Sequence, residues 1–172
     1  MRVWILDRAE PRVDETGTAF STVGGIFYRA VDPAFPEFTL AGSRAAGRFS
    51  PPGIPTLYLS SSREGVAAAM IAHTDARATN LEVLAFDVRA TDIADLRNRE
   101  GMAALGIDVE AAAAPWQDDV AEGRIPASWR VRDGLVKLGA HGLIDPSRKR
   151  PGLWHLTLFD WNHATKPSVR PL

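Results

Sequence analysis

The stretch from Gly47 to Leu59 constrains this chain more than any other, because a stiff turn leads directly into an apolar strand. The turn places two glycines and two adjacent prolines around one arginine, Arg48, and such a loop has restricted backbone freedom. The guanidinium of Arg48 has five donors in fixed geometry, which suit a phosphate or a carboxylate. The strand that follows carries an aromatic hydroxyl at Tyr58. The pattern therefore predicts an anion site for a small molecule.

The composition is that of a globular protein of one domain. The chain has 172 residues, 45% apolar and 24% charged, and its net charge of −1 provides no overall field for nucleic acid or an anionic membrane. It has no cysteine for a disulfide or a thiolate metal site, and its four histidines lack metal-ligand spacing. No apolar run reaches the ~20 residues of a membrane span, and no signal-peptide pattern occurs. We expect a cytoplasmic protein without a metal site.

Strands and helices alternate irregularly along the chain. Apolar runs predict strands over residues 26–31, 56–60, 81–88, 142–144 and 153–159. Caps and apolar stripes predict helices from Ser61 or Ser62 to about His73, over 97–105, over 116–122, and from Pro126 to near Gly139 or Gly142. This order lacks the βαβ rhythm of a doubly wound sheet, so it predicts an α+β fold.

Tyr28 and Arg29 lie near the end of the first predicted strand. In one interpretation Arg29 pairs with Asp32 at the rim of the sheet. In the other it is a second cationic anchor, which would act with Arg48 on a pyrophosphate. Two arginines and two tyrosines, Tyr28 and Tyr58, near strand ends suit a dinucleotide, whose phosphates need donors and whose rings stack on aromatic side chains.

The segment 145–152 is a basic turn between two predicted strands, with Ser147 followed by Arg148-Lys149-Arg150. One interpretation is a solvated hairpin turn. The other places the Ser147 hydroxyl and backbone donors at the mouth of the same cleft, where the basic run attracts an anionic ligand or partner. Glycine-rich dinucleotide and P-loop signatures and a GxSxG elbow do not occur in the sequence.

Together these segments resemble the RES-domain toxin family over roughly residues 24–161. The family's arginine matches Arg29, its glycine-arginine-aromatic loop with the following tyrosine matches Gly47 to Leu59, and its serine matches Ser147. The resemblance implies an ADP-ribosyltransferase-like single domain with a split β core and flanking helices. On this division, residues 1–23 are an N-terminal extension, 24–161 the RES-type domain and 162–172 a flexible tail.

The resemblance also implies a role for individual residues. Catalytic roles fall to Arg29, Tyr58 and Ser147, and contacts with NAD to Tyr28, Arg29, Arg48, Tyr58 and Ser147. The family's glutamate is expected at position 69, where this chain has Ala69. Glu64 lies five residues earlier, on a different side of the predicted helix. Ala69 marks either an inactivated member or one that relies on an acceptor side chain for the missing carboxylate.

The chemistry that the resemblance implies is cleavage of the nicotinamide–ribose bond of NAD, which is a substrate and not a permanently bound cofactor. Nicotinamide leaves as a neutral ring, so the protein must hold the pyrophosphate, stack the ring and stabilise charge on the ribose. The leading hypothesis is a type II toxin that transfers ADP-ribose to a protein acceptor, with a nucleotide-synthesis enzyme as one candidate.

Two alternatives remain open from the sequence. One is an NAD glycohydrolase or phosphorylase that depletes NAD, and the other is a catalytically impaired module that binds NAD or an antitoxin. The expected partner is a helix-turn-helix-type antitoxin that covers the active site. Direct contact with nucleic acid or a membrane is not expected, and a homodimer is one option for the oligomeric state.

Overall fold

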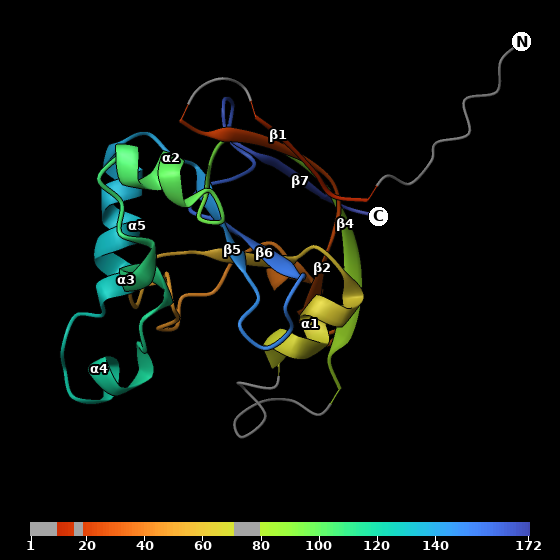
Figure 1. Cartoon of the computed structure of the whole chain (residues 1–172). Helices are drawn as coiled ribbons and strands as arrows, with labels where there is room; N and C mark the ends of the chain where they lie inside the picture. The colour runs from red at the N-terminus through yellow and green to blue at the C-terminus, as the bar shows by residue number, and fades with distance from the viewer. Residues whose placement is uncertain (1–9, 16–18, 71–79) are drawn as a thin grey trace, which may run out of the picture.

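The computed structural model describes residues 10–15, 19–70 and 80–172, which form a mixed sheet with helices beside it (Figure 1). The strands are β1 (Arg12–Glu15), β2 (Ser21–Val31), β3 (Leu57–Ser60), β4 (Glu82–Asp95), β5 (Gly142–Pro146), β6 (Trp154–Leu158) and β7 (Ser168–Pro171). The helices are α1 (Arg63–Met70), α2 (Arg99–Ala104), α3 (Val109–Ala113), α4 (Gln117–Ala121) and α5 (Ala127–Lys137), with a short 3-10 helix at Pro36–Phe38.

The strand order is β1-β2-β3-β6-β5-β4-β7, and β2 also pairs with β4 along most of its length. The pairing of β4 with β5 is parallel, and the other pairings are antiparallel. Only the pair Tyr28–Ser60 joins β2 to β3, and only a short ladder joins β4 to β5. The strands therefore form two groups, β1-β2-β4-β7 and β3-β6-β5, and the predicted α+β class with a split β core is confirmed.

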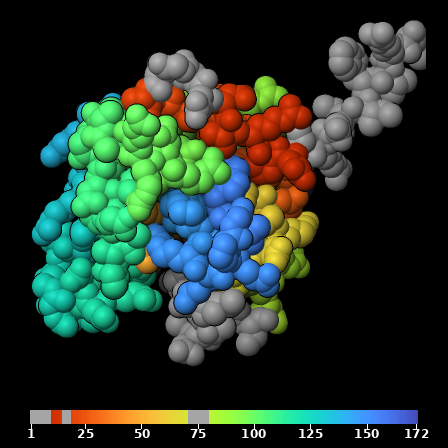
Figure 2. All heavy atoms as spheres, in the orientation of Figure 1, coloured from red at the N-terminus to blue at the C-terminus, as the bar shows by residue number. Residues whose placement is uncertain are grey.

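Helices α2 to α5 lie together beside the β5–β6 region, as the green, cyan and blue atoms of the space-filling view show (Figure 2). Helices α2, α3 and α5 pack on a second apolar cluster, which includes Met102, Ala112 and Leu135 from the helices and Leu143 from β5. Phe49 joins the same cluster with 1% of its surface exposed. The side chain next to Arg48 thus anchors the glycine- and proline-rich loop to the helical side of the fold.

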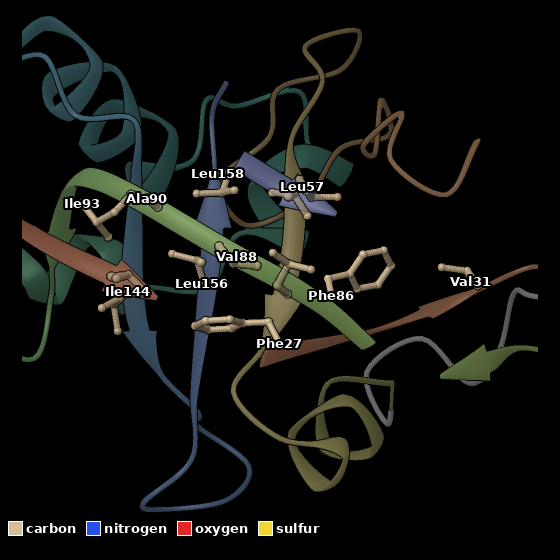
Figure 3. Close-up of a cluster of buried hydrophobic side chains, with 13 residues drawn as sticks. Phe27, Val31, Leu57, Phe86, Val88, Ala90, Ile93, Ile144, Leu156 and Leu158 are labelled. Carbon is tan, nitrogen blue, oxygen red and sulfur yellow. The ribbon is translucent and has the colours of Figure 1, made fainter. Parts of the chain in front are cut away.

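The larger apolar core lies between the two groups of strands (Figure 3). Alternate residues of each strand reach it, as the strand period of two requires. Its members include Phe27, Phe86, Leu57, Leu156 and Ile144, each fully buried. Burial of one such side chain contributes about 1.5–3 kcal/mol. The residues between these positions must therefore project from the opposite faces of their strands.

The two ends of the predicted domain differ from the structure. Residues 162–172 are not a flexible tail, because Ser168–Pro171 forms β7 on the edge of β4. The side chain of Asn162 exchanges hydrogen bonds of 3.0 and 2.8 Å with the backbone of Val169, whose side chain is buried in the core. The N-terminal extension predicted over residues 1–23 contains β1 and the start of β2. These short strands depend on distant partners, and their local patterns are weak.

Two further helix and strand predictions differ from the structure, and a third is not tested by it. β4 continues to Asp95, beyond the predicted end at residue 88, and α3 (Val109–Ala113) was not predicted as a separate helix. The side chain of Asp108 caps α3 by accepting from the backbone amides of Glu110 and Ala111. The predicted extension of α1 to His73 lies outside the described residues.

Candidate functional site

One face of the β3-β6-β5 group carries a set of polar side chains. Leu57 and Leu59 of β3 face the core, so Tyr58 and Ser60 face away from it. Strand pairing places Thr157 and His155 of β6 opposite these two residues. Asp145 of β5 lies opposite His155 in the next ladder. Five polar groups from three strands therefore share one face. This face lies at the border between the group of helices α2 to α5 and helix α1 (Figure 1).

The hydroxyl of Tyr58 ties this face to the loop that precedes β3. It donates to Ser50 Oγ at 2.8 Å and accepts from the Phe49 backbone amide at 3.2 Å. Burial raises the pKa of Tyr58, and the two hydrogen bonds act in the opposite direction. The Tyr58 hydroxyl is thus occupied by the loop, and its ring packs beside the helical apolar cluster.

Helix α5 holds the same loop from the other side. Ser128 Oγ donates to the Arg48 carbonyl at 2.5 Å, and Trp129 Nε1 donates to the Gly47 carbonyl at 2.8 Å. A Cβ atom at Gly47 would lie 2.6 Å from Ser50 Oγ and 2.9 Å from the Tyr58 hydroxyl, so glycine is needed for this close approach. The arginine therefore sits on a loop that is fixed at both sides.

The guanidinium of Arg48 lies at the carboxyl end of α3. Its Nη1 donates to the carbonyls of Ala112 at 3.2 Å and Ala114 at 2.7 Å. Burial, followed by the nearby charge of Arg148, lowers the pKa of Arg48 to about 10, so the group stays protonated at neutral pH. Among the described residues no hydrogen bond is made by its Nε or Nη2. These donors are left for a ligand.

Asp145 is a site residue that sequence reasoning missed, because its position before Pro146 suggests only a turn. Its residue is 6% exposed, and Arg148 Nη2 lies 3.5 Å from its Oδ2. Burial raises the pKa of Asp145 to about 6, although the charges of Arg148 and Arg48 lower it. The signal in the sequence was a carboxylate that directly follows the apolar pair Leu143-Ile144.

His155 and Ser60 form a polar pair beside Asp145. The His155 Nδ1 atom lies 3.0 Å from Ser60 Oγ. Burial, followed by the charge of Arg148, lowers the pKa of His155, so the ring is neutral at neutral pH. The pair continues the polar face of Tyr58 and Asp145 towards the start of α1.

Ser147 follows Asp145 by two residues and is 8% exposed. Its amide donates to the Leu153 carbonyl at 2.8 Å, and its Oγ accepts from the Arg150 amide at 3.2 Å. The side chain of Arg150 forms an ion pair with Glu64 of α1 at 2.5 Å. The basic turn is thus tied to α1, while Arg148 and Lys149 remain exposed.

Tyr28 and Arg29 project from opposite sides of β2. Tyr28 lines a pocket of about 510 Å³ together with Ser62, Arg63 and Trp154, and the Arg63 guanidinium lies 5.1 Å from the centre of its ring. This pocket lies between β2, the start of α1 and the turn before β6. Its aromatic walls can stack against a ring, and Arg63 adds a positive charge.

Arg29 occupies the same side of β2 as Phe27, so its side chain leaves towards the core. Burial lowers its pKa, and among the described residues its buried Nη1 has no hydrogen-bond partner. The Arg29 guanidinium is thus buried on the core side of β2 and, among the described residues, keeps an unpaired donor at Nη1. Asp32 accepts from the Ala34 amide and forms no ion pair with Arg29.

Position 69 is an alanine, so it offers no ionisable group. Ala69 lies on the exposed side of α1, whereas Val66 and Ala68 are buried. Glu64 reaches the Ser147 turn through Arg150, although five residues separate it from position 69.

None of the helices in the described ranges is long and apolar enough to cross a membrane.

Comparison with known proteins identifies a family and a similar fold. The model of the RES domain family matches residues 26–171. The structure is similar to a chain in the crystal structure of the M. tuberculosis MbcT–MbcA toxin–antitoxin complex, with a TM-score of 0.57. The sequences are 17% identical, and the match covers 95% of this chain and 87% of that one, which shows a common fold. No curated protein matches the sequence.

Proposed function

The chain belongs to the RES domain family, and we propose that it is a type II toxin that cleaves NAD and transfers ADP-ribose to a protein acceptor. The observation that carries this proposal is the guanidinium of Arg48. It is charged, fixed on a rigid loop, and has donors left for a ligand beside Arg148. Two neighbouring arginines suit a pyrophosphate, which presents several acceptor oxygens.

Each remaining part of NAD has a counterpart in the neighbouring residues. The nicotinamide or adenine ring stacks in the pocket lined by Tyr28 and Trp154. The Ser147 hydroxyl lies on the same turn as Arg148, where it can donate a hydrogen bond to the ribose. Bond cleavage then requires alignment and stabilisation of the positive charge that forms on the ribose, without a general acid. Arg29 keeps the NAD-binding and catalytic role that the family resemblance implies, because its buried Nη1 has no hydrogen-bond partner among the described residues and is a donor available to NAD.

The MbcT–MbcA structure is a toxin–antitoxin complex, which supports an antitoxin as partner of this chain. An alternative function is an NAD glycohydrolase or phosphorylase, in which water or phosphate takes the place of the protein acceptor. A catalytically impaired NAD-binding module is the third candidate, and the absence of an ionisable group at Ala69 favours it.

Incubation of the purified chain with labelled NAD, with and without cell lysate, separates these functions. We expect label on a protein band in the presence of lysate. Arg48→Ala should weaken NAD binding by about 1.5–3 kcal/mol, the range for hydrogen bonds to charged groups. Arg44→Ala is the matched control, because Arg44 is an exposed arginine of the same loop that donates to the Gly53 carbonyl.

Release of free ADP-ribose without labelled protein would favour the glycohydrolase, and a labelled phosphorylated product would favour the phosphorylase. Binding without turnover would favour the impaired module. Equal NAD affinities of Arg48→Ala, Arg44→Ala and the unchanged protein would contradict the proposed anion site.

A further inference from the structure

Asp145 differs from every other carboxylate whose burial the structure describes, because it alone is buried, with 6% of the residue exposed. A buried carboxylate is unfavourable unless cations and donors compensate for the lost water. Arg148 Nη2 lies 3.5 Å from Oδ2, the outer limit of a hydrogen bond, and even with the charge of Arg48 and a backbone hydrogen bond these partners do not outweigh burial, which raises the pKa of Asp145. A buried charge with such weak partners adds little to stability, which points to a chemical role.

The groups around Asp145 keep it in a form that can accept a proton. Arg148 on its own turn and Arg48 on the loop before β3 both favour the ionised form, and burial opposes them. Tyr58 lies close enough to feel the charge of Asp145, and His155 lies opposite it in the strand ladder. His155 is neutral near neutral pH, so it adds no charge that would compete with Asp145.

We propose that Asp145 is the general base of this site, whose carboxylate accepts the proton of the group that attacks the ribose of NAD. This inference rests on the proposed function. Asp145 lies on the face shared by Tyr58 and His155, two residues before Ser147, so it adjoins the groups assigned to the substrate. A general base at such a place contributes about 10²–10⁴-fold to a rate.

The bonds in this step balance as follows for a hydroxyl acceptor. The bond between ribose C1′ and the nicotinamide nitrogen breaks, and its electron pair leaves with nicotinamide, which becomes neutral. A bond forms between C1′ and the acceptor oxygen. The proton of that oxygen passes to Asp145 and then to solvent. No oxidant, reductant or metal is consumed.

Glu64 is the rival carboxylate, because it also faces the turn that carries Ser147. Its side chain is 56% exposed, however, and Arg150 Nη1 holds it in an ion pair at 2.5 Å. Both features make it a surface link between α1 and the turn. The variants Asp145→Asn and Glu64→Gln are therefore compared. Each removes one negative charge near Ser147 with little change of side-chain shape.

The experiment measures nicotinamide release by the full chain from pH 4.5 to 8.5, with NAD binding and thermal unfolding of each variant as parallel readouts. In the unchanged protein we expect kcat/KM to rise about tenfold per pH unit at low pH and to level off above about pH 6. Asp145→Asn should lower the plateau by about 10²-fold or more and abolish the rise. It should still bind NAD, because loss of a negative charge near the phosphates does not weaken binding. Glu64→Gln should retain both the rate and the profile.

A second variant tests the same assignment even where Asp145→Asn fails to fold. Arg148 lowers the pKa of Asp145, so Arg148→Gln should move the rise in kcat/KM to higher pH. A purely structural role for Asp145 predicts no such movement.

Asp145→Asn with an unchanged rate and profile would overturn the assignment, as would a flat profile of the unchanged protein between pH 4.5 and 7. A loss confined to Glu64→Gln would overturn it in favour of Glu64. Failure of the proposed function gives a different result, because the folded unchanged protein would then release no nicotinamide at any pH. That result would also overturn the role of Asp145, which rests on the proposed function.

Discussion

At the scale of single residues, the polar groups of the site are held by partners far away in the sequence. The Arg48 guanidinium bonds to carbonyls 64 and 66 positions further along the chain, at Ala112 and Ala114. Asp145 differs from these groups, because its charge is only partly compensated by Arg148. Its ionisation must therefore affect the stability of the whole protein.

The pKa of Asp145 rises from 3.8 to about 6 on folding, so the folded protein binds this proton more tightly than the unfolded chain does. Between these two values the folded state carries more protons, and its stability falls as pH rises. One pKa unit corresponds to about 1.4 kcal/mol, and part of the titration is already complete at pH 4, so Asp145 should account for a loss of about 2 kcal/mol between pH 4 and 7.

Urea unfolding of the unchanged protein and Asp145→Asn from pH 4 to 7 measures this effect. The stability of the unchanged protein, relative to Asp145→Asn, should decrease by about that amount over the range. His155 has a lowered pKa and acts with the opposite sign, but both proteins contain it and its effect cancels. A difference that stays constant with pH would contradict the prediction.

At the scale of elements, the close approach of β5 to β6 positions Asp145 opposite His155. Gly142 begins β5, and a Cβ atom there would lie 2.4 Å from the Thr157 carbonyl oxygen and 3.0 Å from the Leu158 side chain. The backbone of β6 cannot move away without disturbing its pairing with β3. Glycine at position 142 is thus needed for the register in which β5 pairs with β6 and places Asp145 opposite His155.

Gly142→Ala should lower the free energy of unfolding by about 1–3 kcal/mol, because it places a methyl group against backbone atoms. Gly134→Ala is the matched control in α5, since its Cβ would meet Ile107 Cδ1 at 3.5 Å, an ordinary contact. It should raise stability by about 0.5–1 kcal/mol through helix propensity. Denaturant unfolding of both variants checks the pair, and equal effects would contradict the close approach of the strands.

At the scale of the whole molecule, charge is distributed locally and not as a global field. The net charge is −1, yet the turn after β5 presents Arg148, Lys149 and Arg150 at the surface beside Ser147. Such a local cluster favours an acidic segment of a partner. The loop that carries Arg48 lies close by, because the guanidinium groups of Arg48 and Arg148 both reach the Ala112 carbonyl, at 3.2 and 3.5 Å.

We therefore predict that an antitoxin partner covers Ser147 and the Arg48 loop. Hydrogen exchange of the chain with and without this partner should show protection over residues 47–53 and 147–152, while β7 on the far edge of β4 exchanges as before. Lys149→Glu should slow association most strongly at low salt, since exposed charges are screened as ionic strength rises. Unchanged exchange at both segments would instead indicate inhibition from another surface.

Features with short-range signals could be predicted from the sequence. The rigid Arg48 loop depends on Gly47 and the adjacent prolines, and the core of α5 depends on apolar residues such as Val131 and Leu135 at helical spacing. The β3 and β6 strands were also located to within one or two residues. Each signal lies within a few residues of the element that it predicts, so neighbouring side chains and turn chemistry are sufficient.

The site required the pairing of segments that are distant in the chain. Asp145 becomes a buried site carboxylate because β5 pairs with β6 in a register that puts it opposite His155. Arg29 becomes a buried cation because it shares the core-facing side of β2, and β7 forms because Val169 fits the core beside β4. A shift of one residue in a strand register would exchange the two faces. Local sequence patterns do not encode that register, which follows from the packing of the complete core.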